Sequence, residues 1–186
     1  VKALQIGGVD ATPENVKNGT YAVSRPFNIA TKGEPTGVAK DFISFILSKE
    51  GQAVVTDNKY IAVNDAAESF VSDGSSGQIA VGGSSSVSPV MEKLIEAYKS
   101  VNPNASIDLQ TSDSTSGMTG AMDGTFAIGM ASRELKDEEA AQLTGTAIAL
   151  DGIAVIVNPA NTIDELSMDQ IKSIYVGDIT DWGDLA

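Results

Sequence analysis

The chain has 186 residues, 42% hydrophobic and 20% charged, a composition typical of an ordinary globular domain. Its formal net charge of −13 argues against the basic face of a nucleic-acid-binding protein. The absence of cysteine and histidine excludes disulfides, thiolate chemistry, the commonest general base and the commonest transition-metal ligand. No apolar run approaches the roughly 18 residues needed to span a bilayer. The chain begins without a signal-peptide pattern, so we expect an exported protein to be represented by its processed form or by a piece.

The first segment, residues 1–63, is expected to contain one strand and one long helix. Residues 20–30 are of extended type but are interrupted by Pro26, which is typical of an edge strand or a bend. Residues 37–57 carry a wide apolar stripe at helical spacing, and Gly51 marks the expected break in this helix.

Residues 64–77 form a joint whose second half has the serine and glycine composition of a flexible linker. The remaining segment, residues 78–186, alternates strands with helices. We expect strands at 78–83, 105–110, 125–130 and 147–157, and helices at 89–100, 116–122, 135–143 and 168–176. This alternation predicts an α/β fold with a mostly parallel central sheet flanked by helices.

Hydroxyl-rich turns follow three of the predicted strands. They are Gly82-Gly83-Ser84-Ser85-Ser86, residues 111–117, and Ala131-Ser132-Arg133-Glu134. Glycines let the backbone approach a ligand, hydroxyls donate hydrogen bonds, and a helix start presents free N–H groups. Because ligands gather beyond the carboxyl ends of the strands in α/β sheets, the three turns together predict a small anion site. The alternative is three solvated loops with ordinary helix caps.

Catalysis is not expected from these residues. A serine hydrolase would need a general base, but histidine is absent and no lysine stands near the serine turns in sequence. The acidic residues are scattered over polar helices and show no EF-hand spacing, so no metal and no cofactor is expected.

Both segments resemble parts of one family, the phosphate-binding subunit of ATP-binding-cassette (ABC) phosphate transporters. Residues 78–185 resemble its amino-terminal part, and residues 1–63 its carboxy-terminal part. The matching stretches are 81–86, 115–117, 128–135, 171–177 and 179–182 in the first case, and 21–26 and 45–52 in the second. The pair 171–177 and 179–182 is the most specific of them.

The resemblance implies a single lobe of a type II periplasmic-binding-protein fold, spanning residues 1–186, with its segments in reversed order. In the family a second lobe lies between the two parts, whereas here the joint bridges the family's two native ends. We therefore expect a circularly permuted, isolated lobe of engineered origin that lacks the second lobe.

The resemblance also places this lobe's share of a phosphate site on the three turns. The candidate ligand-binding residues are Ser84, Ser85, Ser86, Thr115, Ser116, Ser132 and Arg133. Better-known relatives carry an aspartate near Ser132 that accepts the proton of hydrogen phosphate, and this chain has Arg133 and Glu134 instead. Arg133 either pairs with the anion or forms a surface salt bridge. For Asp151, which interrupts an apolar strand, a hinge or turn role is favoured over that of an acceptor.

The implied function is weak binding of phosphate or a similar oxyanion, because half of the family's donors belong to the second lobe. The implied partners are that lobe and the membrane permease of an ABC transporter, the implied location is extracytoplasmic, and no nucleic acid is expected. A surface left by the second lobe predicts a homodimer. The competing interpretation is a scaffold that binds no anion.

Overall fold

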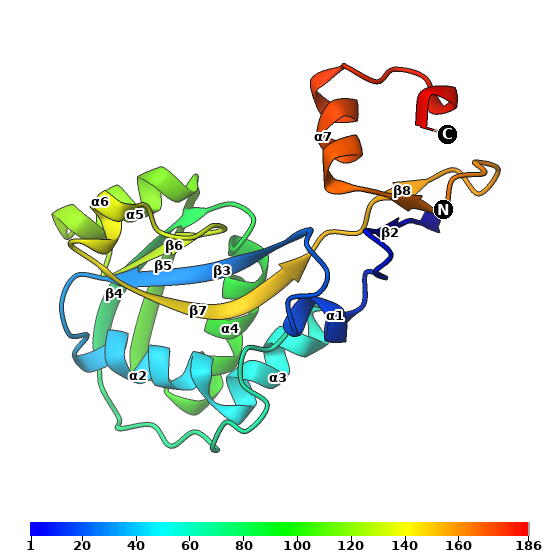
Figure 1. The fold of residues 1–186 in the computed structure, drawn as a ribbon. Helices are drawn as coiled ribbons and strands as arrows, with labels where there is room; N and C mark the ends of the chain where they lie inside the picture. Colours follow the sequence, from blue (N-terminus) through cyan, green and yellow to red (C-terminus); the bar gives the residue numbers. More distant parts are fainter. Residues whose placement is uncertain (186) are drawn as a thin grey trace. The chain divides into compact units, whose positions relative to one another are not determined.

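The computed structural model describes residues 1–185, which divide into two compact units (Figure 1). The larger unit is Arg25–Asp151, and the smaller unit combines residues 1–24 with residues 152–185. The sequence did not predict this boundary, and the assignment of the whole chain to a single lobe stays a prediction. Among the described residues, no helix has the length and apolar character needed to cross a membrane.

The smaller unit is built from short elements. Strand β1 (Lys2–Ala3) pairs antiparallel with β8 (Ile156–Val157), and β2 (Gln5–Ile6) pairs parallel with β9 (Glu165–Leu166). Its helices are α1 (Pro13–Lys17), α7 (Met168–Val176) and a final 3-10 turn (Trp182–Leu185). The helix predicted at 168–176 is confirmed, and none of its residues is buried.

In the larger unit, the described residues form a five-stranded sheet in the order β5-β4-β6-β3-β7. Its strands are β3 (Ser24–Thr31), β4 (Gly77–Ser84), β5 (Ala105–Ser112), β6 (Ile128–Ala131) and β7 (Thr144–Gly152). Strand β4 runs parallel to both β5 and β6, while β3 runs antiparallel to β6. The predicted α/β class, with a central sheet flanked by helices, is confirmed. The strand predicted at 147–157 is divided, because β7 and β8 belong to different sheets.

Helices cover both faces of this sheet (Figure 1). They are α2 (Gly37–Leu47), α3 (Lys49–Asp57), α4 (Ser88–Val101), α5 (Ser114–Asp123) and α6 (Asp137–Ala140). Phe27 and Ile29 of β3 join the main core with α2, α3 and α4, whereas Ala30 joins a smaller core with Met118 of α5. This alternation follows from strand geometry, because successive side chains point to opposite faces.

Two local predictions for the first segment are corrected. Strand β3 is internal to the sheet, and Pro26 is tolerated because the recorded ladder with β6 begins two residues later, at Asn28. The long helix breaks at Ser48, whose hydroxyl donates to the Phe45 carbonyl and accepts from the Gly51 amide. Gly51 lies inside α3, where a Cβ would stand 2.1 Å from the Phe45 carbonyl oxygen.

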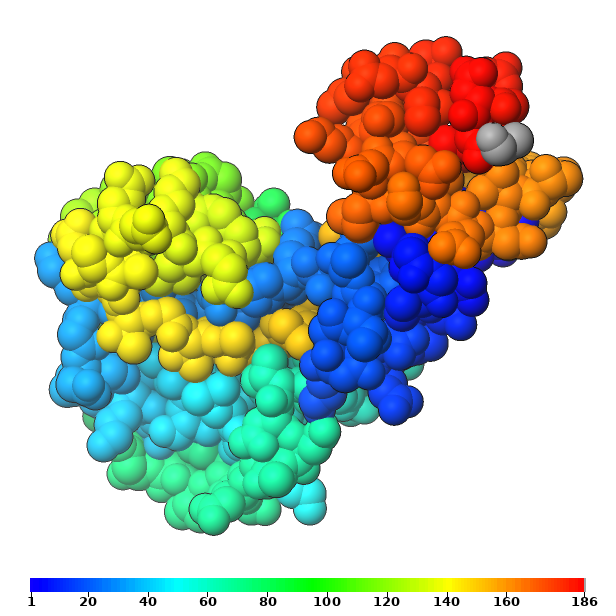
Figure 2. Space-filling model, in the orientation of Figure 1, coloured from blue at the N-terminus to red at the C-terminus, as the bar shows by residue number. Residues whose placement is uncertain are grey.

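Residues 64–76 of the joint contain no helix or strand and run over the surface of the larger unit, and Gly77 begins β4 (Figure 2). The joint is nevertheless held by the buried carboxylate of Asp41 in α2. That carboxylate accepts hydrogen bonds from the Ser72 hydroxyl (2.7 Å) and the Asp73 amide (2.9 Å), and also from Tyr98 and Asn102 of α4 and its C-terminus. Burial alone would raise the pKa of Asp41, but these hydrogen bonds together hold it below its usual value.

Candidate anion-binding site

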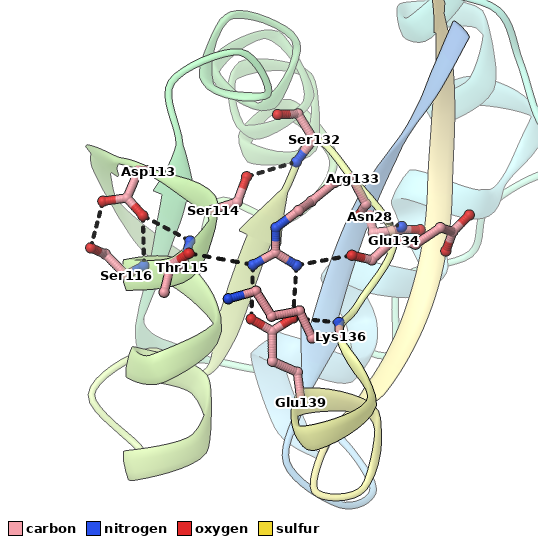
Figure 3. Close-up of polar contacts among 10 residues, drawn as sticks. All are labelled: Asn28, Asp113, Ser114, Thr115, Ser116, Ser132, Arg133, Glu134, Lys136 and Glu139. Carbon is pink, nitrogen blue, oxygen red and sulfur yellow. Dashed lines mark hydrogen bonds and ion pairs between the residues drawn. The ribbon is translucent and has the colours of Figure 1, made fainter.

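The carboxyl ends of β4, β5 and β6 lie at one edge of the sheet because the three strands are parallel. At that edge the turns that follow them are linked by hydroxyl groups. The Ser84 hydroxyl donates to the Ser132 hydroxyl at 3.0 Å. The Ser132 amide donates to the Ser114 hydroxyl at 3.1 Å, as Figure 3 shows. The three turns therefore converge in the structure. Ser114 takes part in this contact, although it was not among the candidate residues from the sequence.

Two glycines allow this close approach. Gly83 has a φ of +137°, and a Cβ there would stand 2.3 Å from the Met130 carbonyl oxygen. A Cβ on Gly117, in the first turns of α5, would stand 2.7 Å from the Gly83 Cα and 2.6 Å from the same oxygen. Only residues without a side chain let β4, α5 and β6 meet here.

The turn between β4 and α4 offers one open backbone donor. The Ser85 amide is used, since it donates to the Ser112 carbonyl at 2.9 Å. The Ser86 amide, by contrast, has no acceptor within the part of the chain that is described. Ser88 is the first residue of α4, and its buried hydroxyl shares a 2.8 Å hydrogen bond with Thr111. No side chain caps α4.

The start of α5 is occupied by a carboxylate of the chain itself. Asp113 is the N-cap, and one carboxylate oxygen accepts from the amides of Thr115 (2.8 Å) and Ser116 (2.9 Å). The other oxygen accepts from the Ser116 hydroxyl at 2.7 Å. The hydrogen bonds from the Ser116 amide and hydroxyl hold the pKa of Asp113 below its usual range. Asp113 thus engages the amides of the exposed Thr115 and Ser116 and the Ser116 hydroxyl, whereas the Thr115 hydroxyl lies 3.5 Å from the Arg133 guanidinium.

Arg133 forms a two-pronged ion pair with the buried carboxylate of Glu139 in α6. The two terminal nitrogens of its guanidinium donate to the two carboxylate oxygens, each at 2.8 Å (Figure 3). The Arg133 guanidinium holds the pKa of Glu139 below its usual range. Of the two roles left open for Arg133, the structure shows an ion pair, and its partner is buried rather than on the surface.

The other carboxylate singled out from the sequence, Asp151, lies at the end of β7. It accepts a 2.9 Å hydrogen bond from Arg25 Nε, so it pairs with a cation at the start of β3. These two residues are the last and first of the larger unit, where the chain passes to and from the smaller one.

Of the predicted set, Ser84 and Ser132 are therefore in direct contact, and Ser86 presents an open amide beside Ser84 in sequence. Asp113, Ser114 and Glu139 were missed. The pattern Asp-Ser-Thr-Ser after a strand is a recognisable N-cap signal for Asp113. Nothing in the local sequence singles out Glu139 from its acidic neighbours.

Comparison with known proteins places this geometry in a family. A model of the PBP superfamily domain matches residues 69–186. The chain belongs to the PBP superfamily. A protein named phosphate-binding protein PstS 2 from Streptococcus agalactiae serotype V is 50% identical over 188 residues, covering 100% of this chain and 64% of its own length. The relative of the same name from Streptococcus pneumoniae serotype 4 is 47% identical, covering 98% of this chain and 62% of its length.

Solved structures of PBP-superfamily relatives agree with the fold. The phosphate-binding protein of a phosphate ABC transporter from Streptococcus pneumoniae TIGR4 superposes with a TM-score of 0.94 at 46% identity, covering 100% of this chain and 72% of that one. A phosphate ABC transporter substrate-binding protein with bound phosphate, from Clostridium perfringens, has a TM-score of 0.52 at 44% identity, covering 59% of this chain and 45% of that one. The predicted resemblance is confirmed. The chain spans less than two thirds of the length of the streptococcal relatives.

Proposed function

We propose that this chain binds inorganic phosphate or a similar oxyanion, as part of the substrate-binding protein of an ABC transporter. The observation that carries the proposal is the meeting of Ser84, Ser114 and Ser132 at one sheet edge, beside the open amide of Ser86. Neutral hydroxyl and amide donors bind a tetrahedral anion without adding a cation. The relative from Streptococcus agalactiae is named as a phosphate-binding protein and the Clostridium perfringens structure holds bound phosphate, which supports the same ligand class.

The proposed activity is binding, not catalysis. The Ser84 hydroxyl contacts another hydroxyl, and Arg133, which follows Ser132, is paired with Glu139. A serine nucleophile would need a base within hydrogen-bond reach, and neither group is placed to act as one.

We infer that the reversed segment order is inherited and not engineered. The streptococcal relatives match 98–100% of this chain in continuous alignments of 182–188 residues, so they share its order of segments. The relatives from Staphylococcus haemolyticus and Bacillus subtilis match only 55–59% of it. A permutation that arose in one branch of the family accounts for both observations.

The isolated chain is proposed to bind weakly, because more than a third of the length of the streptococcal relatives lies outside the part that matches this chain and would supply further donors and exclude water. Each charge-assisted hydrogen bond that is missing costs roughly 1.5–3 kcal/mol of binding free energy. The permease of the transporter and an extracytoplasmic location are proposed on the same kinship. Self-association stays a prediction, and the exposed Tyr175 and Trp182 of the smaller unit are the side chains that support it.

A phosphate titration monitored by amide chemical shifts tests the proposed site. We expect shifts confined to residues 84–88, 114–117 and 131–133, with a dissociation constant on the order of millimolar. Ser84→Ala should reduce them. The matched control is Ser106→Ala, an exposed serine at the opposite end of β5. An unchanged spectrum at tens of millimolar phosphate would instead favour a scaffold without an anion site.

A further inference from the structure

The loop after β6 is held from three directions. The Arg133 carbonyl accepts a 2.9 Å hydrogen bond from the buried amide side chain of Asn28 in β3. The Ser132 amide donates to Ser114 of α5, and the Arg133 guanidinium reaches Glu139 of α6. Figure 3 shows these contacts converging on residues 132 and 133 from separate elements.

The guanidinium of Arg133 has little capacity left for a ligand. Arginine carries five N–H donors, four of them on the two terminal nitrogens. These nitrogens contact both carboxylate oxygens of Glu139, the Glu134 carbonyl (2.9 Å) and, at 3.5 Å, the Thr115 hydroxyl. An anion that paired with Arg133 would have to displace protein acceptors already in place.

Glu139 is equally committed. Its carboxylate is 2% exposed, and beyond Arg133 it accepts the Lys136 amide at 2.8 Å, at the start of α6. It therefore joins the loop after β6 to the helix that follows. Replacing it by glutamine would turn an amide NH2 group toward the guanidinium or leave one prong empty, since a glutamine side chain has only one acceptor oxygen.

Resting on the proposed function, we propose that Arg133 and Glu139 are positioning residues: their ion pair aligns Ser132 for the oxyanion, and Arg133 is not itself a ligand. Because the two charges cancel, this chain selects its anion by the placement of neutral donors.

The two possible roles of Arg133 predict opposite changes in phosphate affinity for the Glu139→Gln variant. If the pair positions Ser132, the variant binds phosphate about tenfold more weakly, the lower end of the loss seen when an orienting partner of a metal ligand is removed. If Arg133 were a ligand held back by Glu139, freeing its charge would tighten binding. Affinity is measured by phosphate titration of the whole chain, at a temperature where all variants are folded.

A second variant keeps the test independent of folding effects. Arg133→Lys retains the positive charge but loses the fork geometry that grips both carboxylate oxygens. We expect it to weaken phosphate binding as much as Glu139→Gln does. In the absence of phosphate, both variants should show a chemical shift of the Ser132 amide that differs from that of the wild-type chain. The matched control is Glu96→Gln, which removes the carboxylate of an exposed ion pair with Lys93 and should change neither reading.

Tighter binding in Glu139→Gln, or wild-type affinity in Arg133→Lys, would overturn the positioning role. If the wild-type chain shows no phosphate response, the proposed function fails and the ion pair is judged by hydrogen exchange of the Ser132 amide. Exchange about tenfold faster in Glu139→Gln than in wild type supports positioning, on the scale set by a typical lost hydrogen bond. Unchanged exchange refutes it.

Discussion

Helices α4 and α5 each follow a parallel strand of the same sheet, yet their first turns are satisfied in opposite ways. At α5 the carboxylate of Asp113 accepts two backbone amides and a hydroxyl. At α4 no side chain caps the helix, and the preceding amide of Ser86 has no acceptor in the described chain. Both helix starts lie beside serine and threonine hydroxyl groups, so the sequence pattern alone does not distinguish them.

The difference indicates where an external anion would be bound. A helix start attracts anions through its free N–H groups, but an internal carboxylate at α5 already fills that position and repels a second negative charge. The open backbone donor, the Ser86 amide, therefore lies before α4. The hydroxyl groups of Ser84, Ser132 and Ser114 lie at the same edge of the sheet. A stretch rich in serine and threonine is a binding loop only if its own acidic residue does not occupy the donors.

The largest expected effect comes from blocking the close approach of α5 to β4 and β6. Gly117→Ala would place a Cβ 2.6 Å from the Met130 carbonyl oxygen and 2.7 Å from the Gly83 Cα. We expect the free energy of unfolding to fall by roughly 3 kcal/mol, the upper end for overpacking, because the obstacle is backbone. Urea denaturation measures it, with Thr119→Ala at an exposed site on α5 as the control. Equal stability of the two variants would show that α5 does not need this approach.

A smaller effect, on phosphate affinity, is expected when a hydroxyl donor near the start of α4 is removed. Ser84→Ala removes a buried hydroxyl that contacts Ser132 at 3.0 Å. Phosphate affinity should fall by about 1 kcal/mol, the net value of a typical hydrogen bond. The corresponding change on the α5 side, Ser116→Ala, should leave affinity unchanged because its hydroxyl is bound to Asp113. A larger loss from Ser116→Ala than from Ser84→Ala, measured by calorimetric titration, would reverse the comparison.

The smallest effect concerns the charge of Asp113. Asp113→Asn keeps an N-cap acceptor but removes the carboxylate, so at neutral pH the variant should be slightly less stable and bind phosphate slightly better. The pKa of Asp113 is lowered in the folded chain, so its stabilisation is present above the ordinary aspartate value of about 3.9 and is lost as the pH falls through the lowered pKa. The melting temperatures of variant and wild type should converge in acid. A constant difference from pH 7 to pH 2 would contradict the assigned cap.

Much of the fold was readable because it depends on local patterns. Alternating strands and helices predicted the class, and the apolar stripe of residues 37–57 predicted both α2 and α3. Errors arose where one local sequence feature is compatible with two different structures. Pro26 excludes a ladder hydrogen bond only at its own position, so it did not force β3 to an edge. Gly51 suggested a helix break, but it serves close packing against the end of α2, and Ser48 makes the break.

The candidate site was predicted in part for the same reason. Ser84 and Ser132 follow glycine-rich or buried strands, and this pattern is visible in the chain. The role of Arg133 was not visible, because its partner depends on which elements pack side by side. The cap formed by Asp113 is local, since its partners lie two and three residues along the chain. Glu139 is one of several acidic residues after Arg133, and only the burial of its carboxylate against the loop separates it from Glu138, which is exposed.

The amino-acid sequence by itself determined the α/β class, the turns that could bind an anion and the kinship with phosphate-binding proteins. These follow from the periodicity of apolar residues and from short motifs, which act over a few residues. The tertiary structure alone decided that β3 enters the sheet between β6 and β7, that Asp41 holds the joint, and that the buried Glu139 engages the guanidinium of Arg133. Hydrogen bonds and ion pairs depend on distances of about 3 Å, and such distances between remote residues exist only once the chain has packed.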